Sequence, residues 1–305
     1  MATPRSSSSS KRKNQNVLYA LIPVVVVLLN FLLRTFGPTI PDVYFNPPEE
    51  GSWVRLDVID VGQGDCLLFT SSMGETMLID AGPAAAKDDV LYFLQQRNIT
   101  KLDYVVATHP HEDHIGSMAA LIRTFPIGTF FLPDITHTTA TFRAMIQALE
   151  DAECDVVAAK AGEDIAWQTG TMRFISPQPG FSETDLNNAS AVLHIQFGDT
   201  SFLLTGDAED LSEQAMLAAY SDIRAQVLKV GHHGSSTSST SAFLDAVQPK
   251  IALISCGADN SYGHPHRETM AGLARVSAAV YRTDTMGSIS VLSDGYGLFI
   301  AYENS

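Results

Sequence analysis

The chain has 305 residues, of which 45% are hydrophobic, and this is enough for one large domain or two small ones with a buried core. Its formal net charge is −15, and residues 1–41 contain five basic side chains and no acidic one, so the rest of the chain is more acidic still. An acidic body excludes a general basic surface for nucleic acid. An anionic substrate would have to be attracted locally, by bound cations.

The N-terminal 51 residues predict a membrane attachment. Residues 1–16 contain a serine run and a basic cluster, and we expect them to be disordered. Residues 17–33 are almost wholly apolar, and as a helix they would be about 25 Å long. We expect segment 17–36 to be an uncleaved transmembrane signal anchor, with the rest of the chain outside the cytoplasm. A signal peptide followed by secretion, or a buried core helix, are the alternatives. The Pro-rich segment 37–51 predicts a tether.

Residues 52–305 alternate short apolar strands with amphipathic helices. In the first half we expect strands at 53–62, 66–70, 76–82, 102–108 and 128–133, and helices at 88–98, 116–125 and 139–151. In the second half we expect strands at 172–176, 190–198, 200–206, 226–231, 250–255, 278–283, 287–292 and 297–302, and helices at 208–220, 239–247 and 267–276. Two β-rich halves with outer helices favour the α/β class, as an αββα sandwich of two packed sheets. Three distant cysteines in apolar contexts (Cys66, Cys154 and Cys256) predict core residues, with one disulfide left open.

A group of metal-ligating side chains directly follows the expected strand at 102–108. It reads His109-x-His111-x-Asp113-His114. Alternate residues of an extended chain point the same way, so His109 and His111 can reach one metal ion, while Asp113 and His114 can reach a second where the chain turns into a helix. Imidazole and carboxylate ligands suit Zn²⁺, Mn²⁺ or Fe. A solvated polar loop is the alternative.

Other candidates stand at the ends of other strands or in turn-rich loops. Asp80 is either a turn former or an acceptor that fixes the tautomer of a ligand histidine. Asp207 is the natural carboxylate bridge between two metals, and also a helix N-cap. His232 and His233 follow an apolar strand, and His264 lies in a loop too rich in turn residues to be core.

Taken together, these motifs resemble the metallo-β-lactamase superfamily and, more specifically, the extracytoplasmic domain of ComEC-type competence proteins. The resemblance covers about residues 53–305, in the family's order, and rests on "LDVIDVGQGDCLLF", "LIDAG", "THPHEDHIG", "NNASAVLHIQFGDTSFLLTGDAE", "LKVGHHGSSTSS", "CGADNSYGHP" and "VYRTDTMGSISV". It implies a nuclease that degrades one DNA strand during uptake, with two divalent ions, Zn²⁺ or Mn²⁺. One apolar segment cannot form the family's channel, so a separate channel protein is expected as a partner.

The chain departs from the superfamily where many members supply a third histidine to the first metal. The segment Asp185–Ser190 contains none, and His194 lies deeper in an expected strand, as a sheet residue. Asn188 or Ser190 could instead hold a metal-bound water or a phosphate oxygen. We therefore expect the ligands to be His109, His111, Asp113, His114, Asp207, His264 and, where the first ion borrows it, His232. A weaker first site suits Mn²⁺ better than Zn²⁺.

The expected reaction is metal-assisted phosphodiester hydrolysis. A water between two cations loses a proton at a pKa near ~7 rather than ~15.7 and attacks phosphorus. Asp113 orients the nucleophile, and His232 or His233 protonates the leaving oxygen or clamps the phosphate. Residues expected around the mouth are Ser235, Ser236, Tyr262, Arg282 and Asp284. A hydrolase of small esters, lactones or phosphodiesters and a non-catalytic membrane-tethered interaction domain are the alternatives.

Overall fold

The computed structural model describes residues 51–181 and 184–303. The expected tail at 1–16, the anchor at 17–36 and nearly all of the tether at 37–51 lie outside the described residues. Within the described part, no helix combines the length and the apolar character needed to cross a membrane.

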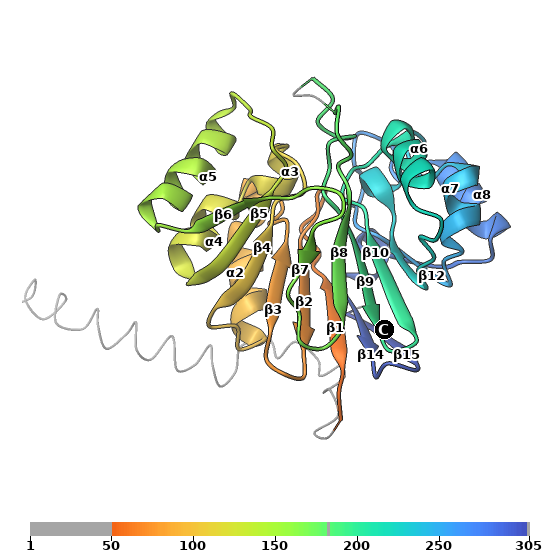
Figure 1. Ribbon diagram of the computed structural model, residues 1–305, viewed down its shortest axis with the longest axis horizontal. Helices are drawn as coiled ribbons and strands as arrows, with labels where there is room; N and C mark the ends of the chain where they lie inside the picture. Colours follow the sequence, from red (N-terminus) through yellow and green to blue (C-terminus); the bar gives the residue numbers. More distant parts are fainter. Residues whose placement is uncertain (1–50, 182–183, 304–305) are drawn as a thin grey trace, which may run out of the picture. The chain divides into compact units, whose positions relative to one another are not determined.

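The first of two sheets has eight strands (Figure 1). In spatial order they are β15 (Leu298–Tyr302), β14 (Ile289–Ser293), β1 (Val54–Val58), β2 (Leu67–Ser71), β3 (Thr76–Ile79), β4 (Leu102–Val106), β5 (Ile127–Leu132) and β6 (Asp155–Ala158). The strands from β15 to β3 pair antiparallel, and those from β3 to β6 pair parallel. The parallel half brings the carboxyl ends of β3 and β4 to one edge, which is where ligands bind in such sheets.

The second sheet has seven strands. In spatial order they are β13 (Ala279–Arg282), β12 (Ile251–Ile254), β11 (Val227–Lys229), β10 (Thr200–Leu204), β9 (Val192–Phe197), β8 (Thr171–Ser176) and β7 (Asp164–Ile165). Here β10 to β13 are parallel, and β7 to β10 are antiparallel. The residues after β10, β11 and β12 therefore share an edge of this sheet as well.

Helices pack on the outer face of each sheet. Against the first sheet lie η1 (Ala84–Ala86), α2 (Lys87–Gln96), α3 (Glu112–Ile115), α4 (Met118–Thr124) and α5 (Ala140–Asp151). Against the second sheet lie α6 (Asp210–Ala219), α7 (Ser241–Val247) and α8 (Arg267–Arg275), while the short η2 (Gly231–Gly234) follows β11 and α9 (Thr283–Met286) follows β13, with Met286 packed against the cluster between the sheets. The amphipathic helices bury their apolar sides here, so the order of layers is helix, sheet, sheet, helix.

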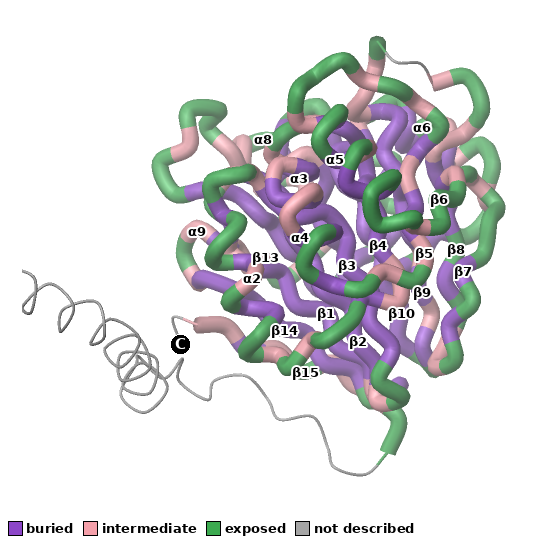
Figure 2. The backbone as a smooth tube through the Cα atoms, turned by 90° about the vertical axis from the view of Figure 1, so that its left-hand side faces the viewer, coloured by how far each residue is buried: buried purple, intermediate pink, exposed green. Residues whose placement is uncertain are grey.

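The largest apolar cluster lies between the sheets. Phe69, Phe174 and Phe202 are fully buried there, and the rings of Phe69 and Phe202 meet edge to face at 5.4 Å. Burying each such side chain contributes about 1.5–3 kcal/mol. The central strands are buried along their length (Figure 2), so the loops that follow them start from rigid positions.

The mixed α/β fold with two sheets is confirmed, and the expected helices and strands are present within a few residues at each end. The sequence analysis missed β6, β7 and α9. These elements are short, and Val156 in β6 is 48% exposed, so the pattern that marks a buried strand is absent. Cys66 and Cys256 are buried, Cys154 is half-buried, and all three are free thiols.

Candidate metal centre

The histidine-rich segment 109–114 lies at the carboxyl end of β4. The chain stays extended at His111 and then forms the single turn α3. His109 Nε2 lies 2.9 Å from His111 Nδ1, and the rings of His109 and His114 are 4.2 Å apart. The change from extended to helical backbone thus gathers three imidazoles around one point.

The turn before β2 fixes the position of Asp113. The Asp65 N–H donates to the carbonyl oxygen of Asp113 at 3.2 Å, and Gly64 lies directly beneath it with φ +145°. A Cβ atom on residue 64 would lie only 2.3 Å from that oxygen. Glycine is therefore required here both for its positive φ and for the close approach of the two backbones.

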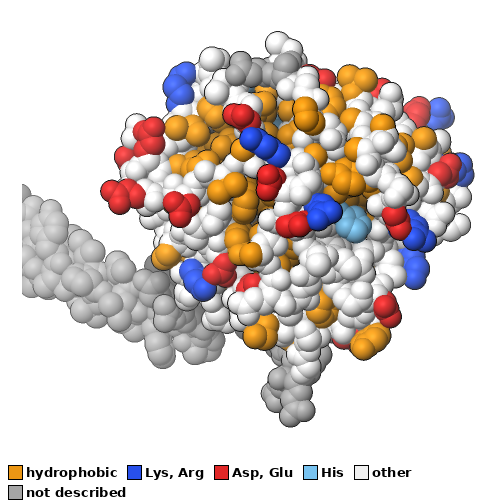
Figure 3. Space-filling view, in the orientation of Figure 1, with side chains coloured by type: hydrophobic (Ala, Val, Ile, Leu, Met, Phe, Trp, Pro, Cys, Tyr) orange, Lys and Arg blue, Asp and Glu red, His pale blue; other side chains and the backbone are white. Residues whose placement is uncertain are grey.

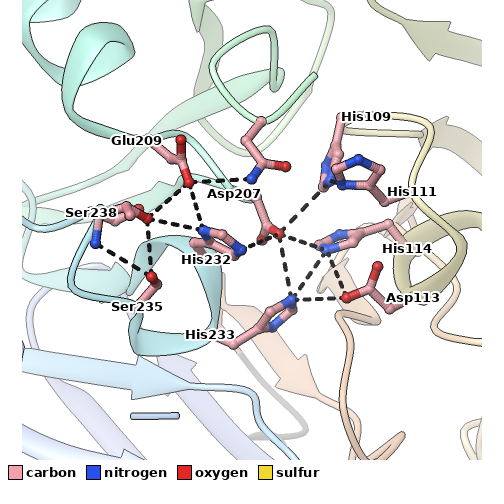
Figure 4. Close-up of polar contacts among 12 residues, drawn as sticks. His109, His111, Asp113, His114, Asp207, Glu209, His232, His233, Ser235 and Ser238 are labelled. Carbon is pink, nitrogen blue, oxygen red and sulfur yellow. Dashed lines mark hydrogen bonds and ion pairs between the residues drawn. The ribbon is translucent and has the colours of Figure 1, made fainter. Parts of the chain in front are cut away.

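Asp207, in the loop after β10, is at the centre of the site (Figure 4). Its Oδ2 lies 3.3 Å from His114 Nε2, 3.5 Å from His233 Nε2, 3.7 Å from His109 Nε2 and 3.8 Å from His232 Nε2. Its other carboxylate oxygen, Oδ1, is buried and has no hydrogen-bond partner among the described residues. One oxygen of this carboxylate thus faces four imidazoles, and the other oxygen has no partner among the described residues.

Asp113, His114, Asp207 and His233 form the tightest group, called here the second cluster. One ligand atom from each lies within 4.8 Å of all the others. His233 Nε2 is 3.3 Å from Asp113 Oδ2 and 3.3 Å from His114 Nε2. The other imidazoles around Asp207 are called the first cluster: His109, His111 and His232.

Buried partners orient the histidines of the second cluster. Asp80 accepts from His114 Nδ1–H at 2.7 Å and from the Thr108 N–H at 2.8 Å. His233 Nδ1–H donates to a backbone carbonyl at 3.0 Å and lies 3.4 Å from Asp65 Oδ1, whose other oxygen pairs with Lys229 Nζ at 2.7 Å. With Nδ1 so bound, each histidine directs Nε2 at Asp207, as metal-ligating histidines do.

Proximity and burial shift the pKa values in the two clusters. Burial, reinforced by the charge of His114, lowers the pKa of His109 well below its usual value. Burial also acts to lower the pKa of His114, but the carboxylates of Asp207 and Asp80 outweigh it and raise this pKa well above the usual value. Burial acts to raise the pKa of Asp113, but the bond with His233 and the charge of His114 outweigh it and the pKa falls. The pKa values of His109 and His114 therefore shift in opposite directions, although their rings are neighbours.

His232 has a carboxylate partner of its own. Its Nδ1 lies 2.9 Å from Glu209 Oε1, and the same oxygen accepts from the Thr237 hydroxyl at 2.8 Å and from Asn187 Nδ2–H₂ at 3.3 Å. The adjacent residue His233 faces the second cluster instead, because both histidines have left-handed backbone angles with φ of 48° and 53°. This backbone conformation is rare outside glycine and marks functional sites.

A pocket of about 330 Å³ opens onto both clusters. Its lining includes Gln63, His111, Glu112, Asp113, Asn187, Asp207, His232, His233, Tyr262 and His264. Tyr262 is 66% exposed, and its ring stacks on that of His264 at 5.6 Å. Burial and the neighbouring charges of His233 and His232 lower the pKa of His264 to about 4. An aromatic pair thus stands at the mouth, above the acidic floor.

The described residues that line this pocket include no lysine and no arginine.

The family model described as the metallo-beta-lactamase superfamily matches residues 59–258, which contain most of this site. The chain belongs to the metallo-β-lactamase superfamily.

Two curated relatives place the chain beside ComEC-type competence proteins, as its motifs predict. It is 32% identical to ComE operon protein 3 of Bacillus subtilis over 301 residues, which cover 90% of this chain and 39% of that protein. It is 29% identical to Recombination protein 2 of Haemophilus influenzae over 286 residues, which cover 92% and 32%. The chain therefore spans less than half the length of either relative.

A solved structure supports the fold. The metallo-beta-lactamase fold protein YhfI from Bacillus subtilis matches with a TM-score of 0.53 and 15% identity, covering 82% of this chain and 100% of that one. At this level of identity the likeness is one of fold alone.

The metallo-β-lactamase fold binds divalent metals, often two, and the residues present here fit such ions. His114 Nε2 and His233 Nε2 face each other at 3.3 Å beside two carboxylates, and Asp207 Oδ1 is buried without a partner in the described residues. In native proteins, nearly all buried polar atoms have a hydrogen-bond partner. A cation between these nitrogen and oxygen atoms satisfies all of them, and imidazole with carboxylate suits borderline divalent ions.

His264 lies beside the second cluster without belonging to it. Its ring centroid is 5.6 Å from that of His232 and 6.2 Å from that of His233. Asn260 fixes its loop by accepting from the His264 N–H at 3.0 Å and donating to its carbonyl at 2.7 Å. His264 lines the pocket, and its role as a metal ligand stays a prediction.

Four of the residues expected around the mouth have hydrogen-bond partners in the structure. Arg282 Nε–H donates to Asp284 at 3.0 Å across the start of α9, and neither residue lines the pocket. Ser235 is buried with its hydroxyl 3.0 Å from that of Thr237. The exposed hydroxyl of Ser236 lies 3.1 Å from His266 Nδ1.

The segment 185–190 supports Asp207 through its backbone and side chains. Asn188 Oδ1 accepts from the N–H groups of Glu209 and Ser212 at the start of α6, so it acts as a cap. Ser190 Oγ accepts from the Asp207 N–H at 3.2 Å. His194 is a sheet residue, as expected, and its Nε2 lies 3.0 Å from the Arg224 carbonyl oxygen.

Sequence reasoning missed the residues that support the clusters. Each of these residues lies in a quoted motif or within four residues of a predicted ligand, and this position is the signal that could have found it. They are Glu209, Asn187, Asp65 and Lys229. Lys229 in particular is fully buried. A buried lysine needs a paired charge, and only the fold reveals Asp65 as that charge.

Proposed function

We propose that the chain is a two-metal phosphodiesterase that cleaves DNA, most readily single strands, outside the cytoplasmic membrane. The observation that carries the proposal is the position of Asp207, whose Oδ2 lies 3.3–3.8 Å from the Nε2 atoms of His114, His233, His109 and His232. A shared carboxylate between two ligand sets is the arrangement that two-metal hydrolysis requires. The competence relatives supply the link to DNA.

His109 and His111 would hold the first ion, Asp113, His114 and His233 the second, and Asp207 both. Bound ions of this kind lower the pKa of water and neutralise phosphate oxygens. Their positive charge offsets the acidic body and draws an anionic substrate into the pocket. Zn²⁺ and Mn²⁺ are the candidates, because both accept imidazole and carboxylate ligands.

His232 is placed to hand a proton to the leaving oxygen. Glu209 accepts from Nδ1–H, so Nε2 faces the pocket beside Asp207. Asp113, whose side chain is one-third exposed to the pocket, orients the nucleophile. An in-line displacement needs one group for the nucleophile and one for the leaving oxygen, and Asp113 and His232 would fill these two roles.

Tyr262 and His264 suit a base at the mouth. Their parallel rings form an exposed aromatic platform, and every base offers a face to stack on one. This favours single-stranded DNA, in which the bases are accessible.

A hydrolase of small phosphodiesters, esters or lactones is the second candidate. It is favoured by the absence of lysine and arginine among the described pocket residues. On the face seen in Figure 3, lysine and arginine side chains are scattered singly among acidic ones. The cations would then be the only positive charge that a long DNA strand meets.

For the location, we propose that residues 17–36 anchor the chain in the cell membrane, with residues 37–51 as a tether and the catalytic domain of residues 52–305 outside. A separate channel protein would then receive the strand that remains. Secretion after cleavage of the signal is the alternative, and N-terminal sequencing of the mature chain separates the two.

The test uses the purified chain with labelled single- and double-stranded oligonucleotides, bis-p-nitrophenyl phosphate and a lactone. We expect cleavage of the single strand with Mn²⁺ or Zn²⁺, silence in EDTA and recovery on adding Mn²⁺. Activity indifferent to chelation would refute the metal mechanism. Turnover of the lactone or small diester without cleavage of either oligonucleotide would assign the second candidate.

A further inference from the structure

Asn187 has an unusual combination of contacts. It lines the pocket with His111, Asp207 and His232, in the segment that lacks a histidine. Its Nδ2–H₂ donates to Glu209 Oε1 at 3.3 Å, while its Oδ1 is buried and has no hydrogen-bond partner among residues 51–181 and 184–303. A buried amide oxygen left unpaired destabilises the fold, so a missing partner is expected.

Glu209 decides which end of this amide faces the site. An ionised carboxylate only accepts, so it must face the NH₂ group of Asn187, and Oδ1 must point away from it. The same carboxylate also holds Nδ1 of His232, which leaves Nε2 of that ring facing Asp207. One acid thus holds two of the side chains that line the pocket, Asn187 and His232.

The chemistry of Asn187 Oδ1 limits the kinds of atom that it can bind. A carbonyl oxygen is an acceptor and cannot bond to a phosphate oxygen, which is an acceptor too. The remaining partners are a cation, or a donor from water or substrate. With His232 assigned to proton transfer, the first cluster offers His109 and His111 with Asp207, and segment 185–190 adds no imidazole.

We propose that Asn187 Oδ1, oriented by Glu209, is the ligand that completes the first cation site. A neutral oxygen in place of an imidazole makes this site harder, so it should prefer Mn²⁺ over Zn²⁺ relative to a site with three histidines. The proposal rests on the proposed two-metal hydrolase, but its test reads metal binding and needs no substrate.

The test titrates the metal-stripped full chain with Zn²⁺ against a chromophoric chelator, and with Mn²⁺ by electron paramagnetic resonance. We expect Asn187→Ala to weaken one of two binding steps on the order of tenfold, and Asn187→His to tighten that step for Zn²⁺ by about as much. The gain in Asn187→His cannot come from a folding defect.

The matched control is Gln63→Ala. Gln63 is another amide in the same pocket, but its Oε1 already accepts from the Gly257 N–H at 3.2 Å. Its substitution should leave both binding steps unchanged.

A crystal of the Mn²⁺ form gives a second test. Asn187 Oδ1 should lie about 2.2 Å from an ion, near the carboxylate–metal distance.

Three results would overturn the proposal. One is that Asn187→Ala and Asn187→His both bind two ions with unaltered affinity. Another is that Asn187→Ala changes KM alone, because Oδ1 would then accept from the substrate. The third is that Gln63→Ala weakens the same step as Asn187→Ala. If instead the parent chain binds no ion, the two-metal function itself fails, and this is distinguishable from all three.

Discussion

The two clusters differ in how their histidines are held. In the second cluster, His114 and His233 bind Asp80 and Asp65, and these four side chains are at most 1% exposed. The ammonium group of Lys229 forms an ion pair with the carboxylate of Asp65. Charge pairs buried to this degree are rigid, because removing either partner leaves an uncompensated charge that costs about 3–5 kcal/mol.

In the first cluster, the support is half-open. The side chains of His232 and Glu209 are 24% and 20% exposed, and their hydrogen bonds run through Thr237 and Asn187 at the edge of the pocket. Solvent reaches this side and weakens each electrostatic contact. In the proposed two-metal scheme, one cation would lie beside the buried pairs of His114 and His233, and the other beside the partly exposed pair of His232 and Glu209.

The largest effect should come from the residue common to both clusters. Asp207→Ala should lower the hydrolysis of bis-p-nitrophenyl phosphate at least about 10³-fold, since a correctly held metal contributes several kcal/mol to the transition state. Asp245→Ala, at an exposed carboxylate paired only with Arg275, should change nothing. Near-normal turnover of the Asp207 variant with saturating Mn²⁺, in a chain that melts like the parent, would break the shared-ligand account.

The next effect sharpens the role of the half-open side. His232→Gln should slow cleavage of DNA by about 10² while changing bis-p-nitrophenyl phosphate by less than about threefold, because p-nitrophenolate leaves without a proton. Steady-state rates on both substrates measure the difference. Equal losses on the two substrates would assign His232 to metal binding rather than to proton transfer.

A smaller effect separates the two kinds of support. Asp80→Asn should weaken the tighter metal-binding step by about 10–100-fold, because a neutral amide no longer polarises His114. Glu209→Gln should weaken only the other step, and by less, because the site is partly solvated. Titration of metal-stripped chains measures both, and a single step weakened in both variants would erase the distinction between the clusters.

The smallest effect concerns the mouth. Tyr262→Ala should raise KM for a single-stranded oligonucleotide about fivefold, in line with a stacking contribution of about 1 kcal/mol per base. Tyr262→Phe keeps the ring and should behave as the parent. If both variants raise KM equally, the hydroxyl and not the ring makes the contact.

Much of the fold could be predicted because its signals are local. Buried strands read as short apolar runs, and the His109–His114 segment follows one of them directly. The strand-end position of Asp207 follows from the same rule. The edge strand β6 gave no such signal, because half-exposed valines in a four-residue strand resemble a loop.

The parts that could not be predicted depend on long-range placement. His232 and His233 are equivalent in sequence, and only the left-handed turn decides that the second one joins Asp113. Asn260 keeps His264 at the mouth through bonds within its own loop. Asn187 and Glu209 are the first and last residues of one quoted motif, but the motif does not show that their side chains meet.

The central claim is that two cations act around one carboxylate. It is tested most directly by adding Mn²⁺ stepwise to the metal-stripped chain while counting bound ions and measuring cleavage of a labelled single strand in the same samples. The account predicts that bound metal saturates at two ions per chain and that cleavage appears only as the second ion binds. Full activity with one ion bound, or with none, would contradict it.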